Sequence, residues 1–266
     1  HKKDGTQRYI CKECGRRFTA LTNTIFDSKK IPISERIEYL LHLFEFHSIN
    51  STAYDNRNSP TTGKYWLIKT FEVLKGIQDD IVLDGTVYLD ETYFTKVRSK
   101  LVTKDGKKLR GISRNKIGVG VACNETTSIF IVTGTSKPSR KSTKETYSQH
   151  IARGSVLVHD DEHSHSILIE ELELESIVYP TKETKGSSDK HNPLYPVNNL
   201  HLLLKQFIRN HGAYDREHLQ DWLNLFWFIM NEPKDKYDKV LKFIEMAVLS
   251  PKKVRYRDAM SSKHCK

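Results

Sequence analysis

The sequence predicts an α/β protein built on a mixed β-sheet, and three observations support this prediction. Three β-rich runs follow one another between residues 86 and 133. Helical and short strand patterns then alternate between residues 143 and 179. Three further helical patterns follow between residues 198 and 249. This order of elements is typical of an α/β layer whose sheet contains both antiparallel and parallel strands.

Two helical patterns precede the sheet. Ser34–His47 carries apolar residues at helical spacing, and a second helix begins at Pro60 and ends before Gly76. Joined through Asn50–Ser59, the two helices could form a DNA-binding helix-turn-helix, although any αα-hairpin gives a similar pattern.

The predicted strands and the later helices are separated by turn and loop residues. The strands are Thr86–Phe94, Ile117–Cys123, Ile129–Thr133, Ser155–His159 and Ser176–Tyr179. The helices are Thr143–Arg153, His163–Leu174, Asn198–Arg209, Glu217–Met230 and Lys236–Leu249. A hairpin turn is expected at 124–127, and a loop rich in Pro, Gly and Ser at 180–196.

Length and composition exclude several classes of protein. The chain has 266 residues, of which 37% are hydrophobic, with 12 Tyr, 11 Phe and 3 Trp, so wholesale disorder is excluded. No run approaches the roughly 18 unbroken apolar residues of a membrane span, and the first residues lack the apolar core of a secretory signal. Four cysteines are too few for a disulfide scaffold. We therefore expect a cytoplasmic protein that does not enter a membrane.

The formal net charge of +10 is concentrated in short segments, which favours a polyanionic partner. Residues 96–116 hold nine basic side chains and a single acid, and a second basic run spans 137–144. The nine are Lys96, Arg98, Lys100, Lys104, Lys107, Lys108, Arg110, Arg114 and Lys116. The positive charges in such a block repel one another unless an anion binds to them. Double-stranded DNA is the anionic partner that we expect.

Two acidic residues stand at the ends of predicted strands. Asp90 follows the apolar run Val87–Leu89, and Asp160 follows Val156–His159. Either residue alone is most simply a turn or helix-cap residue. If the two strands are neighbours, however, both carboxylates lie at one edge of the sheet and need a cation, for which Mg²⁺ is the natural choice.

A third candidate group lies on the helix that begins at Asn198. Asn198, His201 and Lys205 have the spacing i, i+3 and i+7, which places them on one helical face. Asn offers a carbonyl oxygen, and Lys an ammonium that can hold a phosphate. The simpler interpretation is a polar, solvent-facing side of an amphipathic helix.

Four segments resemble one branch of bacterial insertion-sequence transposases. Tyr9–Thr24, with the Ile25-Phe26 exit, resembles the end of that branch's zinc ribbon. The segments that resemble its three catalytic blocks are Asp90–Tyr93, Gly154–Asp160 and Val197–Lys205. The resemblance spans roughly residues 9–230, and its specificity comes from the order of the segments.

The resemblance implies a domain organisation. It implies a catalytic domain of ribonuclease-H-like fold, preceded by a zinc ribbon and a helical DNA-binding region. The expected domains are a partial zinc ribbon (1–31), the helical region (32–79), the catalytic domain (80–250) and a basic tail (251–266).

It also implies a DDE-type transposase, which cuts element ends and joins their 3′-hydroxyls to target DNA. Asp90, Asp160 and Asn198 would hold two divalent ions, Mg²⁺ or Mn²⁺. Lys205 would contact a backbone phosphate, and His201 would position DNA or a water, or serve a structural role. The implied partners are terminal inverted repeats, target DNA and further copies of the chain.

The sequence departs from this family at three points. Only Cys11 and Cys14 are present where two cysteine pairs form a zinc site, so they are half of a set. Asp160 is followed by Asp161, which leaves two candidates for the second acidic ligand; we favour Asp160 because it directly ends the strand. Asn198 replaces the commoner Glu and removes one negative charge.

Three other interpretations remain. A decayed or domesticated transposase would bind DNA without cutting it, and the missing cysteine pair and Asn198 favour this slightly. A junction resolvase would cut branched DNA without strand transfer. Last, the acids could all be caps of a basic α/β protein without catalytic activity.

Overall fold

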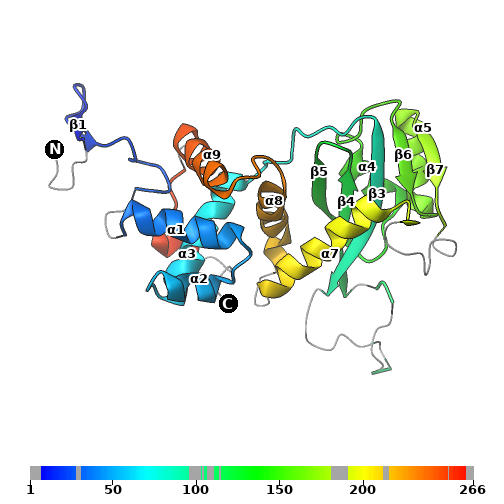
Figure 1. The fold of residues 1–266 in the computed structure, drawn as a ribbon, viewed down its shortest axis with the longest axis horizontal. Coiled ribbons are helices and arrows are strands. Elements are labelled where there is room, and N and C mark those ends of the chain that lie inside the picture. The colour runs from blue at the N-terminus through cyan, green and yellow to red at the C-terminus, as the bar shows by residue number, and fades with distance from the viewer. Residues whose placement is uncertain are drawn as a thin grey trace. The chain divides into compact units, whose positions relative to one another are not determined.

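The computed structural model of the protein contains the mixed sheet (Figure 1). Its strands are β3 (Thr86–Thr95), β4 (Lys116–Cys123), β5 (Ser128–Thr135), β6 (Val156–His159) and β7 (Glu175–Val178), in the order β5-β4-β3-β6-β7. The first three strands pair antiparallel, and β6 and β7 run parallel to β3. The predicted mixed sheet is therefore confirmed, and its arrangement is ribonuclease-H-like.

The structure describes residues 7–27, 31–95, 103, 105–106, 111–113, 115–180, 191–211, 216–250 and 252–261. These residues form two compact units, one of residues 76–231 and one of residues 1–75 with 232–266.

Helices cover both faces of the sheet. α4 (Arg140–Tyr147) packs on β5 and on α5 (Ser166–Leu172), which follows the short 3₁₀ turn η1 (His163–His165). On the other face, α7 (Tyr195–Asn210) packs against β3 and β4, and α8 (Leu219–Met230) against β5. The core on the α4–α5 side consists of Leu83, Val87, Leu89, Ala122, Ile129, Tyr147, Ile151, Leu157, Leu168 and Leu174.

The predicted helix Thr143–Arg153 is shifted toward the N-terminus in the structure. α4 begins three residues earlier because the Ser139 hydroxyl accepts a hydrogen bond from the Ser142 backbone and forms a capping box with it. It ends at Tyr147, after which Ile151 bridges to Leu83 beside the sheet.

The other unit consists of helices and one small hairpin. Its helices are α1 (Ile33–Phe44), α2 (Ile49–Asp55), α3 (Pro60–Leu74), α9 (Lys236–Leu249) and α10 (Tyr256–Ser261), and its hairpin pairs β1 (Tyr9–Ile10) with β2 (Arg17–Phe18). Residues 232–250, which the sequence assigns to the catalytic domain, lie in this unit because α9 packs on α1 and α3. The predicted basic tail contains α10, which packs on α3.

The predicted connection Asn50–Ser59 contains a helix that the sequence pattern did not reveal. α2 is short, and the Ser48 hydroxyl caps it by accepting a hydrogen bond from the Ser51 amide. α3 follows after a four-residue turn and approaches α2 closely at Gly63, where an added Cβ would lie 3.1 Å from Ile49 and 3.2 Å from Ala53. The two helices predicted to form a helix-turn-helix, α1 and α3, are therefore separated by α2 and not joined by a single connection. The pair that a short turn does join is α2 and α3, which is called the helix–turn–helix below.

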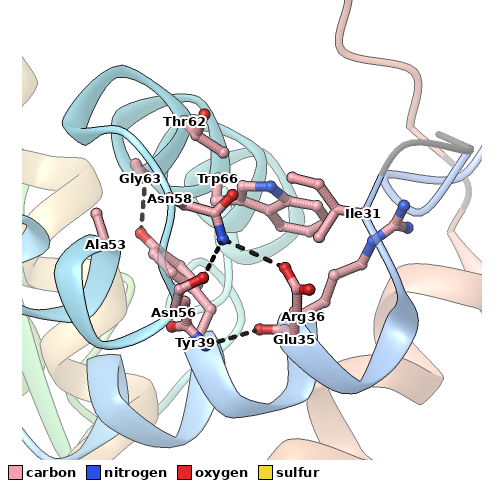
Figure 2. A pocket seen from close by; sticks show the side chains of 10 residues that line it. All are labelled: Ile31, Glu35, Arg36, Tyr39, Ala53, Asn56, Asn58, Thr62, Gly63 and Trp66. Carbon is pink, nitrogen blue, oxygen red and sulfur yellow. Dashed lines mark hydrogen bonds between the residues drawn. The ribbon is translucent and has the colours of Figure 1, made fainter.

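The turn between α2 and α3 is tied to α1 by polar contacts (Figure 2). Asn56 donates from Nδ2 to the Glu35 carbonyl (3.4 Å), and Asn58 donates from Nδ2 to the Glu35 carboxylate (3.4 Å). Tyr39 of α1 donates its hydroxyl to the Gly63 carbonyl (2.9 Å). These contacts fix the orientation of α3 on α1.

A buried lysine gives this unit a testable pH dependence. Lys69 is 2% exposed, donates to the Ile25 carbonyl (2.7 Å), and has its pKa lowered to about 8 by burial and by the charge of Arg36. The unfolded chain holds this proton up to about pH 10.5, so raising the pH from 8 to 10 favours the folded state. We expect the free energy of unfolding to rise by about 2 kcal/mol over that interval relative to Lys69→Met, as measured by urea denaturation. Parallel pH profiles for the two proteins would contradict this assignment.

Candidate active site

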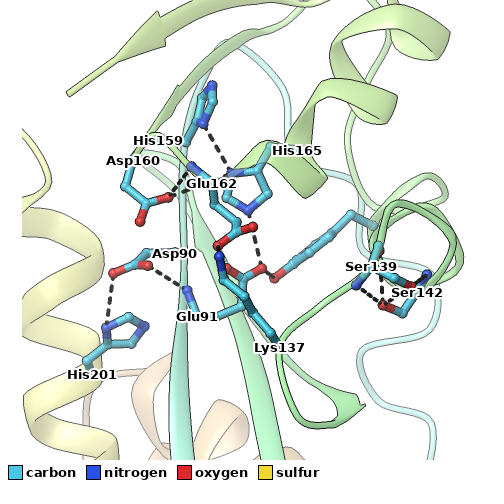
Figure 3. A network of polar contacts seen from close by, with 11 residues as sticks. Asp90, Glu91, Lys137, Ser139, Ser142, His159, Asp160, Glu162, His165 and His201 are labelled. Atoms are coloured by element: carbon cyan, nitrogen blue, oxygen red, sulfur yellow. Dashed lines mark hydrogen bonds and ion pairs between the residues drawn. The ribbon is translucent and has the colours of Figure 1, made fainter. Parts of the chain in front are cut away.

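Asp90 and Asp160 lie side by side (Figure 3). Asp160 directly follows β6, as predicted, but Asp90 lies in the middle of β3 and not at its end, because β3 continues to Thr95 in its pairing with β4. β3 and β6 are parallel neighbours in which Leu89 pairs with His159, so the next residue of each strand is one of the two aspartates. Residues in register on parallel strands project to the same face of the sheet. The structure thus brings together the two acids that the sequence singled out.

Asp90 is held between its own backbone and helix α7. Its Oδ1 accepts a hydrogen bond from the Glu91 amide (2.8 Å), and its Oδ2 lies 3.7 Å from Nδ1 of His201. Burial raises the pKa of the Asp90 carboxyl to about 7, and the negative charges of Asp160 and Glu91 act in the same direction. The ionised form of Asp90 is therefore destabilised.

Asp160 directly follows β6 and begins the turn into η1. Its Oδ1 accepts a hydrogen bond from the Glu162 amide (3.2 Å) and lies 4.0 Å from Nδ1 of His165. Burial raises the pKa of Asp160; the charge of His165 opposes this rise, and that of Glu91 adds to it. Asp161, the alternative ligand, is exposed.

The donor set at this edge fits a divalent cation. Burial destabilises the ionised forms of both Asp90 and Asp160, which raises their pKa values. The charge of Asp160 destabilises the ionised form of Asp90 further. A bound cation reverses this penalty, and hard oxygen donors that are partly exposed to solvent suit Mg²⁺ or Mn²⁺.

Helix α7 carries the third group of candidates. His201 is buried beside Asp90, and burial together with the positive charge of Lys205 lowers its pKa to about 4. His201 is therefore a neutral neighbour of Asp90 at pH 7, and the 3.7 Å separation is a polar contact. Lys205 is exposed and close enough to act on His201. Asn198 is half-buried one turn before His201, about 4.5 Å along the helix axis.

Glu91 forms a second cluster, which the sequence analysis did not identify. Side chains alternate along β3, so Glu91 faces α4 while Asp90 faces α7. The Glu91 side chain is 4% exposed, and its Oε1 accepts a hydrogen bond from the Tyr147 hydroxyl (2.9 Å). It also contacts Nε2 of His165 (3.3 Å), which is fully buried. Burial alone lowers the pKa of His165, but the hydrogen bond and charge of Glu91 outweigh it and raise the pKa.

The cluster continues through two further side chains to the neighbouring strand. The Nδ1 atoms of His165 and His159 lie 3.1 Å apart, and Nε2 of His159 lies 3.0 Å from the Ser176 hydroxyl. Burial and the charge of His165 lower the pKa of His159 to about 4. His165 thus bridges Glu91 and His159, and this polar network (Glu91, Tyr147, His165, His159 and Ser176) fixes the side chain that faces Asp160.

The alternation of buried and less buried residues along β3 could have identified Glu91 as a buried acid. It places this carboxylate on the buried face, where an acid needs a partner. The partners Tyr147 and His165 come from separate elements, and no local pattern in the sequence connects them to Glu91.

Most of the predicted DNA-binding block lies outside the described residues. Of its nine members only Lys116 is described, and its ammonium donates to the Thr95 hydroxyl (3.1 Å). The second basic run is paired with acids: Lys137 with Glu162 (2.8 Å), Arg140 with Glu170 (2.7 Å) and Lys144 with Glu171 (2.6 Å).

Gly120 on β4 makes room for the Tyr147 hydroxyl. Gly120 pairs with Glu91, and an added Cβ would lie 2.0 Å from the Tyr147 oxygen and 2.6 Å from Cζ. We expect Gly120→Ala to destabilise the protein by about 1–3 kcal/mol, because the fully buried ring cannot move aside. Since the hydroxyl is the nearest atom, Gly120→Ala should lower the free energy of unfolding by less when Tyr147 is replaced by Phe. Urea denaturation of the four proteins measures this coupling, and strict additivity would contradict the packing argument.

No protein-family model matches the chain, and no curated protein matches it. Across the described ranges, no helix combines the length and apolar composition needed to cross a membrane. Among solved structures, the Mos1 strand transfer complex matches with 14% identity and a TM-score of 0.36, covering 86% of this chain and 80% of that chain. The mariner Mos1 paired end complex with Mg matches with 16% identity and a TM-score of 0.36, covering 87% and 83%. These values are too low to assign a function.

Proposed function

We propose that the chain is a DDE-type DNA transposase of the zinc-ribbon insertion-sequence branch. It would cut the ends of a mobile element and join their 3′-hydroxyls to target DNA. The observation that supports this most strongly is the pair Asp90 and Asp160, whose raised pKa values mark a site that favours a cation. Two carboxylates from neighbouring parallel strands of a ribonuclease-H-like sheet are the arrangement that the sequence resemblance implies.

Each residue of the site has a distinct role in this proposal. When bound, Mg²⁺ or Mn²⁺ activates the attacking oxygen and stabilises the leaving oxygen of an in-line displacement. Asp90, Asp160 and Asn198 supply the oxygen ligands. The exposed ammonium of Lys205 holds a backbone phosphate of the DNA, and neutral His201 packs against Asp90 without competing for its charge.

We propose that the helix–turn–helix recognises the base sequence of the terminal repeats. The protein would act on DNA in the cytoplasm. Thr61 and Lys64 are exposed in the first turns of α3, the part of a recognition helix that contacts base edges. The basic block at 96–116 would hold the flanking duplex. Because two element ends must be brought together, we propose that the chain acts as a homo-oligomer on DNA.

Cys11 and Cys14 lie on the β1–β2 hairpin and are proposed as half of a zinc site. Gly15 closes the turn with φ +68° and donates its amide to the Cys11 carbonyl (2.9 Å). Hydrogen bonds from the backbones of Cys14 and Glu13 lower the pKa of the Cys11 thiol, and the thiolate is the form that binds zinc. A closed tetrahedral site needs two more ligands.

The decisive experiment uses duplexes that carry the inverted repeats expected on the two sides of this gene. We expect Mg²⁺-dependent cuts that leave 3′-hydroxyls, followed by joining of those ends to a second duplex, with neither product in EDTA. Binding without cutting, at any Mg²⁺ or Mn²⁺ concentration, would refute the enzymatic proposal and support the DNA-binding alternative.

Asn198→Glu tests the third ligand. A carboxylate at this position adds a negative charge next to the cation, so we expect half-maximal cleavage at about tenfold lower Mg²⁺, equivalent to about 1.4 kcal/mol. The matched control is Asn199→Glu, which adds the same charge about 100° further round the helix and should leave the Mg²⁺ dependence unchanged. Equal Mg²⁺ profiles for Asn198→Glu and the parent would exclude Asn198 as a ligand.

A further inference from the structure

A cluster of two histidines and one aspartate lies in the helical unit, separate from the candidate active site. His42 is in the last turn of α1, His47 follows that helix, and Asp55 is the last residue of α2. Their potential ligand atoms all lie within 4.8 Å of one another. The side chains are 24%, 41% and 37% exposed, respectively, so solvent reaches the cluster.

The local backbone explains how the two histidines meet. Phe46 has φ +66°, a left-handed conformation that ends α1 and turns the chain back on itself. The His47 amide then donates to the His42 carbonyl (3.1 Å), as in a Schellman motif. This turn brings the two imidazoles together, with ring centroids 5.0 Å apart.

One of the two nitrogen–oxygen distances in the cluster equals the edge of a zinc tetrahedron, and the other exceeds it by about 0.6 Å. Nδ1 of His42 lies 3.3 Å, and Nδ1 of His47 lies 4.0 Å, from the same Oδ2 atom of Asp55. Ligands about 2.0–2.1 Å from a tetrahedral zinc ion are separated by about 3.3–3.4 Å. Both Nδ1 atoms are buried and, within the described part of the chain, neither makes a hydrogen bond. One ion between the three side chains would satisfy both nitrogens.

The electrostatic setting also favours a cation. Asp55 occupies the C-terminal end of α2, where the helix dipole is negative and an acid is unfavourable. His42 lies at the C-terminal end of α1, so two negative helix ends converge on the cluster.

We propose that His42, His47 and Asp55 bind one divalent transition-metal ion of the zinc type, with water at the remaining position. Two imidazoles and one carboxylate are a donor set that zinc accepts in sites with an open position. The ion would tie the end of α1 to the end of α2 and so brace the helix–turn–helix. This site does not depend on the proposed catalysis.

The test measures zinc bound per chain by equilibrium dialysis in excess Mg²⁺. The full chain carries Cys11→Ser and Cys14→Ser, which remove the proposed half zinc site, Cys265→Ser, which removes the thiol near the C-terminus, and Asp160→Asn, which removes one acidic ligand of the candidate active site. We expect one zinc equivalent in this background, and its loss in each of His42→Gln, His47→Gln and Asp55→Asn. Co²⁺ should give the visible bands of a four-coordinate ion in the background protein alone.

The matched control is His218→Gln. His218 lies 3.3 Å from Asp221, so this change also removes a histidine from a histidine–aspartate pair, but outside the proposed site. It should keep the zinc equivalent. His47 follows the helix, so His47→Gln remains informative if His42→Gln does not fold, as judged by circular dichroism. No zinc in the background protein, or an unchanged equivalent in folded His47→Gln and Asp55→Asn, would overturn the proposal.

Discussion

Replacing Asp90 or Asp160 by Asn is expected to reduce Mg²⁺-dependent strand cleavage by about a thousandfold or more, with little change in DNA binding. The substitution keeps the size of the side chain and an oxygen that can accept the amide hydrogen bond, but it removes the charge that holds the cation. Several kcal/mol of transition-state stabilisation are lost with the ion, and each 1.4 kcal/mol is about tenfold in rate. Single-turnover cleavage and a gel-shift titration on the same duplex measure the two quantities.

The same substitutions should stabilise the metal-free protein. Burial and the neighbouring acids disfavour the Asp90 carboxylate, so Asp90→Asn removes an unfavourable buried charge. In EDTA we therefore expect a higher Tm for Asp90→Asn than for the parent, and added Mg²⁺ should raise the Tm of the parent only.

The neighbouring aspartate provides the control for both measurements. Asp161 is exposed, and Asp161→Asn should retain full cleavage and the Mg²⁺-dependent rise in Tm. If Asp161→Asn lost cleavage and Asp160→Asn kept it, the second acidic ligand would be Asp161. Full cleavage by Asp90→Asn would refute the assignment of this site as the active site.

The two aspartates were accessible from the sequence because each follows a short apolar run, although only Asp160 stands at the end of its strand and Asp90 lies in the middle of β3. Val87–Leu89 and Val156–His159 are short apolar runs bounded by an acid, and a crossover through a helix makes such strands parallel. Local sequence patterns could not show whether the two strands are adjacent, because the pairing of strands depends on the whole sheet. The order β5-β4-β3-β6-β7 supplies that step.

Other parts of the structure had no adequate local signal. Helix α2 is only seven residues long and contains Asn, Ser, Thr and Asp, which are weak helix formers, so packing against α3 at Gly63 decides its conformation. Helix α9 has a clear amphipathic pattern, but such a pattern does not say which neighbour covers it. Its partners, α1 and α3, are about 160–215 residues away in the sequence.

Glu91→Gln is expected to lower the free energy of unfolding by about 3 kcal/mol. It removes the carboxylate partner of a fully buried histidine, and breaking a buried ion or hydrogen-bond pair by removing one partner is costly. The amide can still accept the Tyr147 hydrogen bond, so the loss measures mainly the charge contact with His165. Tyr147→Phe, which removes a neutral donor, should cost only about 1 kcal/mol.

Glu91→Gln should also slow cleavage by about 10- to 100-fold, because His165 lies 4.0 Å from Asp160 and its orientation depends on Glu91. Combining Glu91→Gln with His165→Gln should cost less stability than the sum of the two single changes, since each removes the other's unpaired charge. Urea denaturation of the four proteins gives the coupling energy, and cleavage at saturating Mg²⁺ gives the rate. Additive stabilities together with an unchanged rate would show that the polar network does not support the metal-binding edge.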